Sequence, residues 1–475
     1  MALREPVPLV EPRELGHVHI MGVGGAGLSG IAGCYAALGL PVSGCDRGDS
    51  AALRDLAAQG VPVLIGHDPA HLDGVDALGA VETLVVSSAI REDNPELVAA
   101  RAAGLRVWHR SAALGALMLG RRGVAVTGTH GKTTTSAMAV TALRGAGLDP
   151  SFVVGSPLTS TGRSFGIGRG GVFVVEADES DGSFLQYPAQ VVVVTNIEAD
   201  HLDNWGTPQR YAHGFERLVA QPGVRFLVAD LDDPGAAALA AHAPAHVQVV
   251  GIGESAQAAV RLADESTTGV GARATLRYEG RAHELRLAVP GRHNLVDAAA
   301  AFAVGALLGA DADALVEGLA GFAGTARRFQ LVGQADGVRV YDDYAHHPTE
   351  IAATLTAARS AGGRLVVCFQ PHLYTRTRDF ADAFGRALAL ADEVVVTDVY
   401  AAREDPIPGV TGRLVADAAE RAGARVSYVA DKADLPRRLA QIARDADLVV
   451  TVGAGDVTEV GPQLVRLLAQ RGGHG

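Results

Sequence analysis

The chain has 475 residues, too many for one hydrophobic core of ordinary size, so two or three domains are expected. Hydrophobic residues make up 48%, charged residues 20%, and there are 58 glycines, which is typical of a globular α/β protein with many tight turns. The net charge of −12 argues against nucleic acid or an anionic membrane as partner, and the longest apolar runs are strand-sized, which predicts no membrane insertion.

The N-terminal residues lack the charged-then-apolar order of a signal peptide, so a cytoplasmic protein is expected. The three cysteines, Cys34, Cys45 and Cys368, stand in apolar surroundings without paired spacing. Buried, reduced thiols are therefore expected, in place of a disulfide or metal framework.

Residues 17–46 have the pattern of a strand, a glycine turn, a helix to about Leu38 and a second strand that ends at Asp46. The turn has G-x-G-x-x-G spacing, formed by Gly22, Gly24 and Gly27. This is the dinucleotide-binding pattern, with an acidic residue near its expected place. The pattern requires only a diphosphate near the turn and a sugar hydroxyl near Asp46, so a UDP-sugar fits as well as NAD.

Further strands are predicted at Pro62–Ile65, Thr83–Ser87 and Leu105–Trp108, alternating with helices. Ser87 and Ser88 end a buried strand, where open α/β sheets place ligand contacts. His67 also follows a strand, as a ligand contact or as a solvated loop histidine. We place the end of this first domain near residue 120.

The most informative stretch is VAVTGTHGKTTTS, which begins at Val124 and ends at Ser136. An apolar strand, a glycine turn and a helix start in this order predict a phosphate-binding loop, with Lys132 at the β- and γ-phosphates and the Thr133 hydroxyl on magnesium. The general pattern requires glycine where Val126 stands, so this is a contracted variant. The alternative is an ordinary strand–turn–helix with a surface lysine. Against it, Lys132 is one of only two lysines, and an ammonium acts on phosphate as a point charge.

Two more predicted strands are followed directly by segments that contain acidic residues. VFVVEADESD begins at Val172, and VVVVTNIEADHLD begins at Val191. Carboxylates delivered in this way to the end of a buried strand suit a hard cation with oxygen ligands. Solvated acidic turns are the competing interpretation.

Later segments continue the α/β pattern. Residues 222–290 contain short β-like segments, with Glu279 and Gly280 at a hairpin turn, and are expected to extend the central sheet. Strands then alternate with helices again, which predicts another doubly wound sheet. These strands are Val338–Asp342, Arg364–Gln370, Glu393–Asp398, Arg425–Val429 and Leu448–Val452.

The segments GTHGKTTT, EADESD, TNIEADHLD and MGVGGAGLSG, with PGRHNLVDAAAA, GTARRFQ, DDYAHHPTE and FQPHLYTRTRDF, resemble the Mur ligase family over essentially the whole chain. The chain looks most like the members that add L-alanine. The resemblance implies an ATP- and Mg²⁺-dependent ligase that joins L-alanine to UDP-N-acetylmuramate through an acyl phosphate, in peptidoglycan precursor synthesis. We expect a monomer or homodimer.

The resemblance also implies three α/β domains. Residues 1–120 would form a Rossmann-like UDP-sugar domain, 121–325 a central P-loop-type ATPase domain, and 326–475 a Rossmann-like C-terminal domain that contributes amino-acid and nucleotide contacts. The implied UDP-sugar contacts are Gly22, Gly24, Gly25, Gly27, Asp46, His67, Ser87 and Ser88.

By the same resemblance, His293 and Asn294 would bracket adenine, Arg328 would reach the γ-phosphate, and Asp343 would contact the ATP ribose. The other implied ATP contacts are Gly128, Thr129, His130, Gly131, Lys132, Thr133 and Thr134. The implied metal ligands are Thr133, Glu176 and His201. The implied amino-acid contacts are His346, His347, Arg376 and Arg378, and the implied catalytic residues are Lys132, Arg328, His346 and His347.

Two features depart from the wider family pattern. Leu373 stands where the pattern FQPHRYSRT has arginine, so a carboxylate contact from that position is lost or supplied elsewhere. The chain also has no lysine between Lys132 and Lys432, so it lacks the carbamoylated lysine of several relatives, as the alanine-adding members do. For Arg378, an ion pair with Asp379 or Asp382 is a competing role.

Three other functions stay open at this point. A family member that joins a tripeptide to the same UDP-sugar would share nearly every motif. An NAD-dependent oxidoreductase would use the first glycine turn but leave the phosphate loop unexplained. A nucleotide-gated binding protein would have no catalysis.

Overall fold

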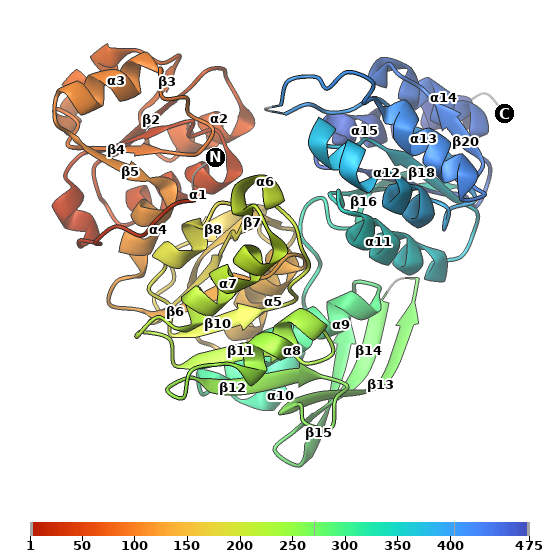
Figure 1. The fold of residues 1–475 in the computed structure, drawn as a ribbon, viewed down its shortest axis with the longest axis horizontal. Helices are drawn as coiled ribbons and strands as arrows, with labels where there is room; N and C mark the ends of the chain where they lie inside the picture. The colour runs from red at the N-terminus through yellow and green to blue at the C-terminus, as the bar shows by residue number, and fades with distance from the viewer. Residues whose placement is uncertain (1–2, 270, 403, 473–475) are drawn as a thin grey trace. The chain divides into compact units, whose positions relative to one another are not determined.

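The computed structural model describes residues 3–269, 271–402 and 404–472 of the chain, shown in Figure 1. The residues group into two compact units. The first contains residues 1–264, 274–285 and 296–322, and the second contains residues 265–273, 286–295 and 323–475.

The first unit begins with a five-stranded parallel sheet in the order β3-β2-β1-β4-β5. Its strands are β1 (Val18–Met21), β2 (Val42–Asp46), β3 (Val63–Ile65), β4 (Thr83–Val86) and β5 (Arg106–His109). The strands alternate with α1 (Ala26–Ala37), α2 (Ala51–Ala58), α3 (Pro95–Ala102) and α4 (Arg110–Met118). Short 3₁₀ helices lie at η1 (Pro12–Leu15), η2 (Pro69–Asp73) and η3 (Asp76–Leu78). The strand order reverses at β1, which places the first glycine turn at a switch point.

The central sheet has ten strands in the order β15-β14-β13-β12-β11-β10-β6-β9-β7-β8. Its strands are β6 (Arg122–Thr127), β7 (Ser151–Leu158), β8 (Arg163–Gly166), β9 (Val172–Glu176), β10 (Val191–Val194), β11 (Phe226–Asp230), β12 (Gln248–Gly253), β13 (Val260–Thr268), β14 (Gly271–Tyr278) and β15 (Arg281–Leu287). β6 lies between β10 and β9 and pairs with both in parallel, so the strand ends with the predicted chemistry share one edge.

The helices of this part are α5 (Lys132–Gly145), η4 (Ser183–Gln186), α6 (Leu202–Trp205), α7 (Pro208–Val219), α8 (Pro234–Ala241), α9 (Arg292–Leu307) and α10 (Ala312–Ala320). α5 packs on strands β7 and β9 and on α10. Most of its side chains between Thr133 and Leu143 are buried, so the helix after the phosphate loop is a core element.

The third sheet has the order β16-β17-β21-β18-β19-β20. Its strands are β16 (Gln330–Ala335), β17 (Val338–Asp343), β18 (Leu365–Phe369), β19 (Glu393–Val396), β20 (Val426–Tyr428) and β21 (Leu448–Val452). Only the edge strand β16 is antiparallel to its neighbour among these described pairs. Helices α11 (Pro348–Ser360), α12 (Tyr374–Leu388), α13 (Gly412–Arg421), α14 (Leu435–Ile442) and α15 (Val460–Gly472), with η5 (Lys432–Asp434) and η6 (Asp456–Glu459), complete it.

The predicted fold class is confirmed, with a mainly parallel sheet in each of three successive parts of the chain. The hairpin prediction also holds, since Glu279 and Gly280 have φ of 48° and 75°, as a two-residue turn of this kind requires. Strands β7 and β8 were not predicted. Gly155 and Pro157 interrupt the pattern of β7, and the sheet tolerates them because they lie in the irregularity between Val153 and Leu158, outside the paired residues of this strand.

All three cysteines are free and buried, as predicted. Across the described residues, no helix combines the length and the apolar character needed to cross a membrane. The boundaries at residues 120 and 325 stay predictions, because the compact units group the first two predicted domains together.

We predict that Gly145→Ala destabilises the protein. A Cβ at Gly145 would lie 2.5 Å from Cα of Gly318, at the contact between α5 and α10, and overpacking of this kind costs about 1–3 kcal/mol. Helix propensity alone would favour alanine by about 1 kcal/mol. A decrease in the free energy of unfolding therefore shows that the packing against Gly318 outweighs helix propensity. Thermal unfolding measures it. Gly171→Ala is the control, since a Cβ there meets nothing within 4 Å. A Gly145→Ala variant as stable as the parent would contradict the packing.

Candidate active site

The first glycine turn is held by the strand next to it. The N–H groups of Gly22 and Val23 donate to the carbonyl of Cys45, and Gly22 has φ of 74°, a conformation that favours glycine. Asp46 Oδ2 accepts from the Gly24 N–H at 2.9 Å. Asp46 therefore shapes the turn directly, and its predicted contact with a sugar hydroxyl stays a prediction.

Two side chains near the start of α4 link this turn to the central acidic segments. Ser88 Oγ donates to Asp181 Oδ2 at 2.7 Å, and Arg110 Nη2 lies 3.0 Å from Asp178 Oδ2. A Cβ at Gly27 would lie 3.6 Å from Arg110 Nη1, so this guanidinium is beside the glycine turn. Arg110 was missed, although it lies only two residues after the predicted strand Leu105–Trp108, which is the signal that could have found it.

His109 lies within this group and is almost buried. Its Nε2 is 3.2 Å from Ser88 Oγ, and its Nδ1 is 2.9 Å from Ser111 Oγ. Burial and the neighbouring Arg110 lower the pKa of His109 to about 4, so its imidazole is neutral at pH 7. The positive charge beside the glycine turn therefore comes from Arg110.

The second glycine turn leads from β6 into α5 as predicted. Gly128 and Gly131 have φ of 132° and 82°. A Cβ at Gly128 would lie 2.1 Å from Thr195 Oγ1, so the loop also needs glycine there for space. α5 begins at Lys132, which directs its first backbone N–H groups toward the loop.

The loop is fixed to the end of β10 by an unusually complete set of hydrogen bonds. Asn196 Oδ1 accepts from His130 N–H at 2.9 Å, and Asn196 Nδ2 donates to the His130 carbonyl at 3.1 Å. Thr195 Oγ1 donates to the same carbonyl at 2.5 Å. Asn196 thus acts on both backbone groups of one loop residue. It belongs to the quoted motif TNIEADHLD but was not predicted as a site residue.

Lys132 bends back over its own loop and pairs with a buried acid. Its Nζ donates to the carbonyls of Gly128 at 2.6 Å and Thr129 at 2.9 Å, and lies 2.8 Å from Glu179 Oε2. Burial alone would lower the pKa of Lys132, but the carboxylates of Glu179 and Asp178 outweigh it and raise the pKa. Burial raises the pKa of Glu179, and the lysine ammonium opposes that rise. The lysine is therefore a fixed positive charge.

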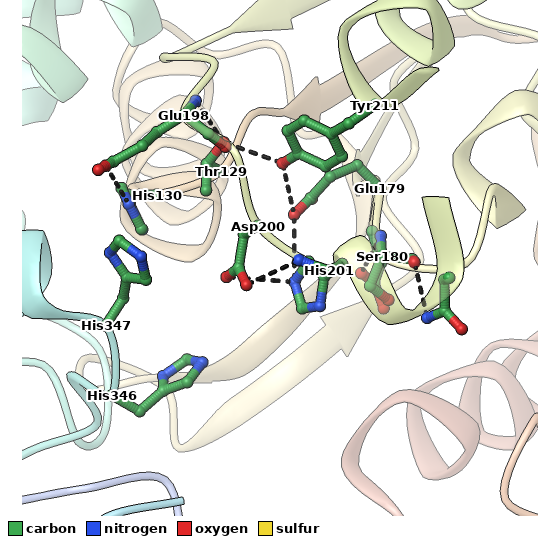
Figure 2. Close-up of polar contacts among 12 residues, drawn as sticks. Thr129, His130, Glu179, Ser180, Glu198, Asp200, His201, Tyr211, His346 and His347 are labelled. Atoms are coloured by element: carbon green, nitrogen blue, oxygen red, sulfur yellow. Dashed lines mark hydrogen bonds and ion pairs between the residues drawn. The ribbon is translucent and has the colours of Figure 1, made fainter. Parts of the chain in front are cut away.

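Figure 2 shows how Glu179 connects to its other neighbours. Tyr211 lies between Thr129 and Glu179, with its hydroxyl 2.9 Å from Thr129 Oγ1 and 3.4 Å from Glu179 Oε1. His201 Nε2 lies 3.7 Å from Glu179 Oε1 and 3.6 Å from Asp200 Oδ2. Glu179 is fully buried and joins the loop lysine to His201, yet it was not among the predicted site residues.

The three predicted metal ligands come from three elements of the first unit. His201 lies beside Glu179 and Asp200. Thr133 is buried in the first turn of α5. Glu176 ends β9 in register with Val126, and its Oε2 accepts from Gly155 N–H at 2.6 Å. The site is rich in carboxylate oxygens, which suits Mg²⁺, and the metal roles of these three residues stay predictions.

The remaining predicted ATP contacts belong to the second unit. Asn294 Nδ2 donates to the Pro290 carbonyl at 2.6 Å, which fixes the start of α9. Asp343 is buried and accepts from Phe329 N–H at 2.7 Å, Ala345 N–H at 2.8 Å and the Thr354 hydroxyl at 3.2 Å. Burial raises the pKa of Asp343 to about 6, against the effect of Arg328. Asp343 thus already organises its own loop.

The two predicted arginines of the amino-acid site lie on different faces of α12. Arg376 is buried, whereas Arg378 is exposed and pairs with Asp379, Nε to Oδ1 at 2.7 Å. Residues two positions apart on a helix do not face each other, so the structure does not bring them together. The competing ion pair is what it shows for Arg378.

The two predicted histidines have different environments. His347 is buried, its Nδ1 caps α11 by accepting from Thr349 N–H at 3.4 Å, and its ring packs on Phe380. His346 is half-buried, with Nδ1 3.1 Å from the Tyr344 carbonyl and 3.3 Å from Glu350 Oε2. Capping is a structural role, so of the two His346 is better suited to contact a ligand.

Leu373 precedes α12 with φ of 68°, and its N–H donates to the Tyr400 carbonyl at 3.0 Å. A bulky residue in this conformation is strained, and strain of this kind concentrates at functional sites. The family's arginine is thus replaced at a position with a specialised backbone.

We predict that Asn196→Ala loosens the phosphate loop without unfolding the protein. The change removes two hydrogen bonds to His130, which corresponds to about 1–2 kcal/mol, or roughly 5- to 30-fold faster amide exchange. Hydrogen exchange of the loop peptide measures this. Asn204→Ala, which removes only a bond to the Ser180 carbonyl, is the matched control. Equal exchange of the loop in both variants would contradict the role of Asn196.

Three family models match the chain in succession. "Mur ligase family, catalytic domain" matches residues 17–122, "Mur ligase middle domain" matches residues 126–305, and "Mur ligase, glutamate ligase domain" matches residues 327–455.

Curated relatives match over nearly the full length. The UDP-N-acetylmuramate–L-alanine ligase of Cutibacterium acnes is 60% identical, covering 98% of this chain and 99% of the relative. That of Kineococcus radiotolerans is 56% identical, with 96% and 97% covered. The crystal structure of UDP-N-acetylmuramate-alanine ligase MurC from Thermotoga maritima superposes with a TM-score of 0.79 at 29% identity, covering 96% of this chain and 99% of that one. The chain belongs to the Mur ligase family.

Proposed function

We propose that the chain is an ATP-dependent ligase that adds L-alanine to the lactyl carboxylate of UDP-N-acetylmuramate, in the synthesis of peptidoglycan precursors. The observation that carries this proposal is the 60% identity, over nearly the whole of both chains, to a ligase of that name. The phosphate loop supports it independently, because a lysine held as a fixed charge at a helix start suits ATP.

Amide formation in water requires activation of the acid, because a carboxylate is a poor electrophile. In the proposed reaction the lactyl carboxylate attacks the γ-phosphate of ATP, which gives an acyl phosphate and ADP. The neutral amine of alanine then attacks the acyl carbon, and phosphate leaves. The protein's main task is to bring two anions together and to position the amine.

Charge neutralisation falls to Lys132 and Arg328, with Mg²⁺ as cofactor. Lys132 is suited to this because its own carboxylate partner Glu179 and two loop carbonyls already fix its ammonium. Thr133, Glu176 and His201 would hold the metal, which supplies further positive charge to the phosphates when bound. The buried carboxylate of Glu179 beside His201 keeps that histidine oriented.

The two substrates are assigned to different parts of the chain. The glycine turn with Gly22, Gly24, Gly25 and Gly27, together with Asp46, His67, Ser87 and Ser88, would bind UDP-N-acetylmuramate. To these we add Arg110, which lies beside Gly27 and suits an anionic group. For the alanine carboxylate and amine, we propose Arg376 and His346, with supporting roles for His347 and Arg378. We place the reaction in the cytoplasm, where ATP is available.

The rival with the same motifs joins a tripeptide to this UDP-sugar. The expected discriminator is the amine that supports phosphate release. We predict that purified enzyme with Mg²⁺, ATP and UDP-N-acetylmuramate releases phosphate on addition of L-alanine, and not of a tripeptide. Release with the tripeptide alone would favour the recycling reaction. Release that ignores both amines would indicate a nucleotide-binding protein without ligase chemistry.

Lys132→Ala tests the role of the phosphate loop. We expect kcat to fall by roughly 10²- to 10³-fold, the usual cost of removing a group that stabilises developing charge. Binding of UDP-N-acetylmuramate, measured by calorimetry, should be unchanged, because the first glycine turn holds that ligand. The other lysine provides a matched control, since Lys432 pairs with Asp456 and Glu459 in the C-terminal part, and Lys432→Ala should keep the parent rate. Loss of sugar-nucleotide binding in folded Lys132→Ala would overturn the assignment.

A further inference from the structure

Four potential metal ligands meet inside the N-terminal sheet, apart from the residues proposed for catalysis. They are His19 on β1, Cys45 at the end of β2, His71 on η2 and Glu96 at the start of α3. One donor atom from each lies within 4.8 Å of all the others. The side chains of His19 and Glu96 are fully buried, and Cys45 is buried too. The cluster therefore lies in the protein core and not among the solvated charges of the surface.

Three distances to the Glu96 carboxylate can be compared with the edges of a metal-centred tetrahedron. With Zn–N and Zn–O near 2.0–2.1 Å and Zn–S near 2.3 Å, these edges come to roughly 3.3–3.6 Å. Cys45 Sγ lies 3.4 Å from Glu96 Oε2, and His71 Nδ1 lies 3.5 Å from the same oxygen. His19 Nε2 is 2.9 Å from the other carboxylate oxygen, Glu96 Oε1, and this pair would have to separate by a few tenths of an ångström.

Short polar contacts hold the ring of His19 in place. His17 Nδ1 is 2.8 Å from the Gly79 carbonyl, which can only accept, so His17 donates there. The Ser43 hydroxyl oxygen lies 2.8 Å from His17 Nε2 and 2.8 Å from His19 Nδ1. The other ring nitrogen of His19, Nε2, faces Glu96 Oε1.

His19 Nε2 is buried and, among the described residues, makes no hydrogen bond of acceptable geometry. Buried acids and bases are retained when they are paired or bind a metal. His71 Nδ1 is buried as well and, within the described part of the chain, accepts no hydrogen bond and donates none. A divalent ion would satisfy His19, His71 and Glu96 together. The Cys45 thiolate and the Glu96 carboxylate would balance its charge of +2.

We propose that His19, Cys45, His71 and Glu96 form a structural zinc site that holds β1, β2, η2 and α3 together. The mixed nitrogen, sulfur and oxygen donors suit Zn²⁺, and four protein ligands in a buried position are typical of a structural site. The bond of His19 to Ser43 is the outer contact that orients a zinc-binding histidine. His67, whose Nδ1 is 3.4 Å from Cys45 Sγ, lies just outside the four.

The proposed zinc site would also stabilise the first glycine turn, through the backbone of Cys45. The carbonyl of Cys45 accepts the N–H groups of both Gly22 and Val23, so the residue that binds the metal also fixes the turn. The proposal does not depend on which amine or sugar the enzyme uses, so its tests are independent of the ligase reaction.

The experiment uses full-length, tag-free protein freed of metal with a chelator, in excess Mg²⁺ so that oxygen-rich sites are occupied. We expect one equivalent of Zn²⁺ to bind tightly and to raise the melting temperature. Co²⁺ in its place should give the near-ultraviolet thiolate charge-transfer band and the strong visible bands of a tetrahedral site. No zinc binding and no cobalt band in folded protein would overturn the proposal.

Cys45→Ser should abolish the cobalt charge-transfer band, whereas Cys34→Ser, a buried cysteine of the same domain, should keep it. Ser43→Ala leaves all four ligands in place and should weaken zinc binding by about 10- to 100-fold, as loss of an outer contact does. Circular dichroism shows that each variant is folded. A cobalt band that persists in Cys45→Ser, or unchanged zinc affinity in Ser43→Ala, would overturn the site.

Discussion

The ion pair between Lys132 and Glu179 is the interaction on which the central site depends. A lysine at the start of a buried helix would be costly without a partner, because burial disfavours its charge. Glu179 supplies that partner at 2.8 Å, and the carbonyls of Gly128 and Thr129 satisfy two more of its protons. The pair also imposes a cost, since Glu179 is itself fully buried. Tyr211 and His201, which surround its other oxygen, reduce that cost and so become part of the same site.

The pair explains why the loop needs such a firm anchor on β10. The lysine is drawn toward its own loop carbonyls, so the loop backbone must be held from outside to keep its shape. Asn196 and Thr195 supply this by bonding both backbone groups of His130. The parallel pairing of β6 with β10 places those side chains beside the phosphate loop, because both strands end at the same edge of the sheet. Sheet register, loop shape and charge placement are thus one connected arrangement.

Sequence patterns predicted the fold well where the strands are buried on both faces. Leu448–Val452 was predicted to the residue and β10 begins at the predicted Val191, because uninterrupted runs rich in valine have few alternative structures. β7 was missed because Gly155 and Pro157 disrupt the pattern, and only the neighbouring strands show that the sheet tolerates them. Motif residues were easier to find than their partners. Glu179, Asn196 and Arg110 act through tertiary contacts that spacing along the chain does not encode. The separation of Arg376 from Arg378 likewise depends on where α12 begins and which face it buries.

The chain's near-exclusive use of arginine gives the Lys132 pair a practical consequence. Reagents that acylate amines meet only two side-chain amines in the whole sequence. Carboxylates pair with both ammonium groups, so exposure is what distinguishes them: Lys132 in the phosphate loop is 15% exposed, whereas Lys432 on the C-terminal part is 31% exposed. Dyes, cross-linkers or surfaces that couple through lysine side chains will therefore favour Lys432, which makes the enzyme convenient to label at a known side chain without engineering.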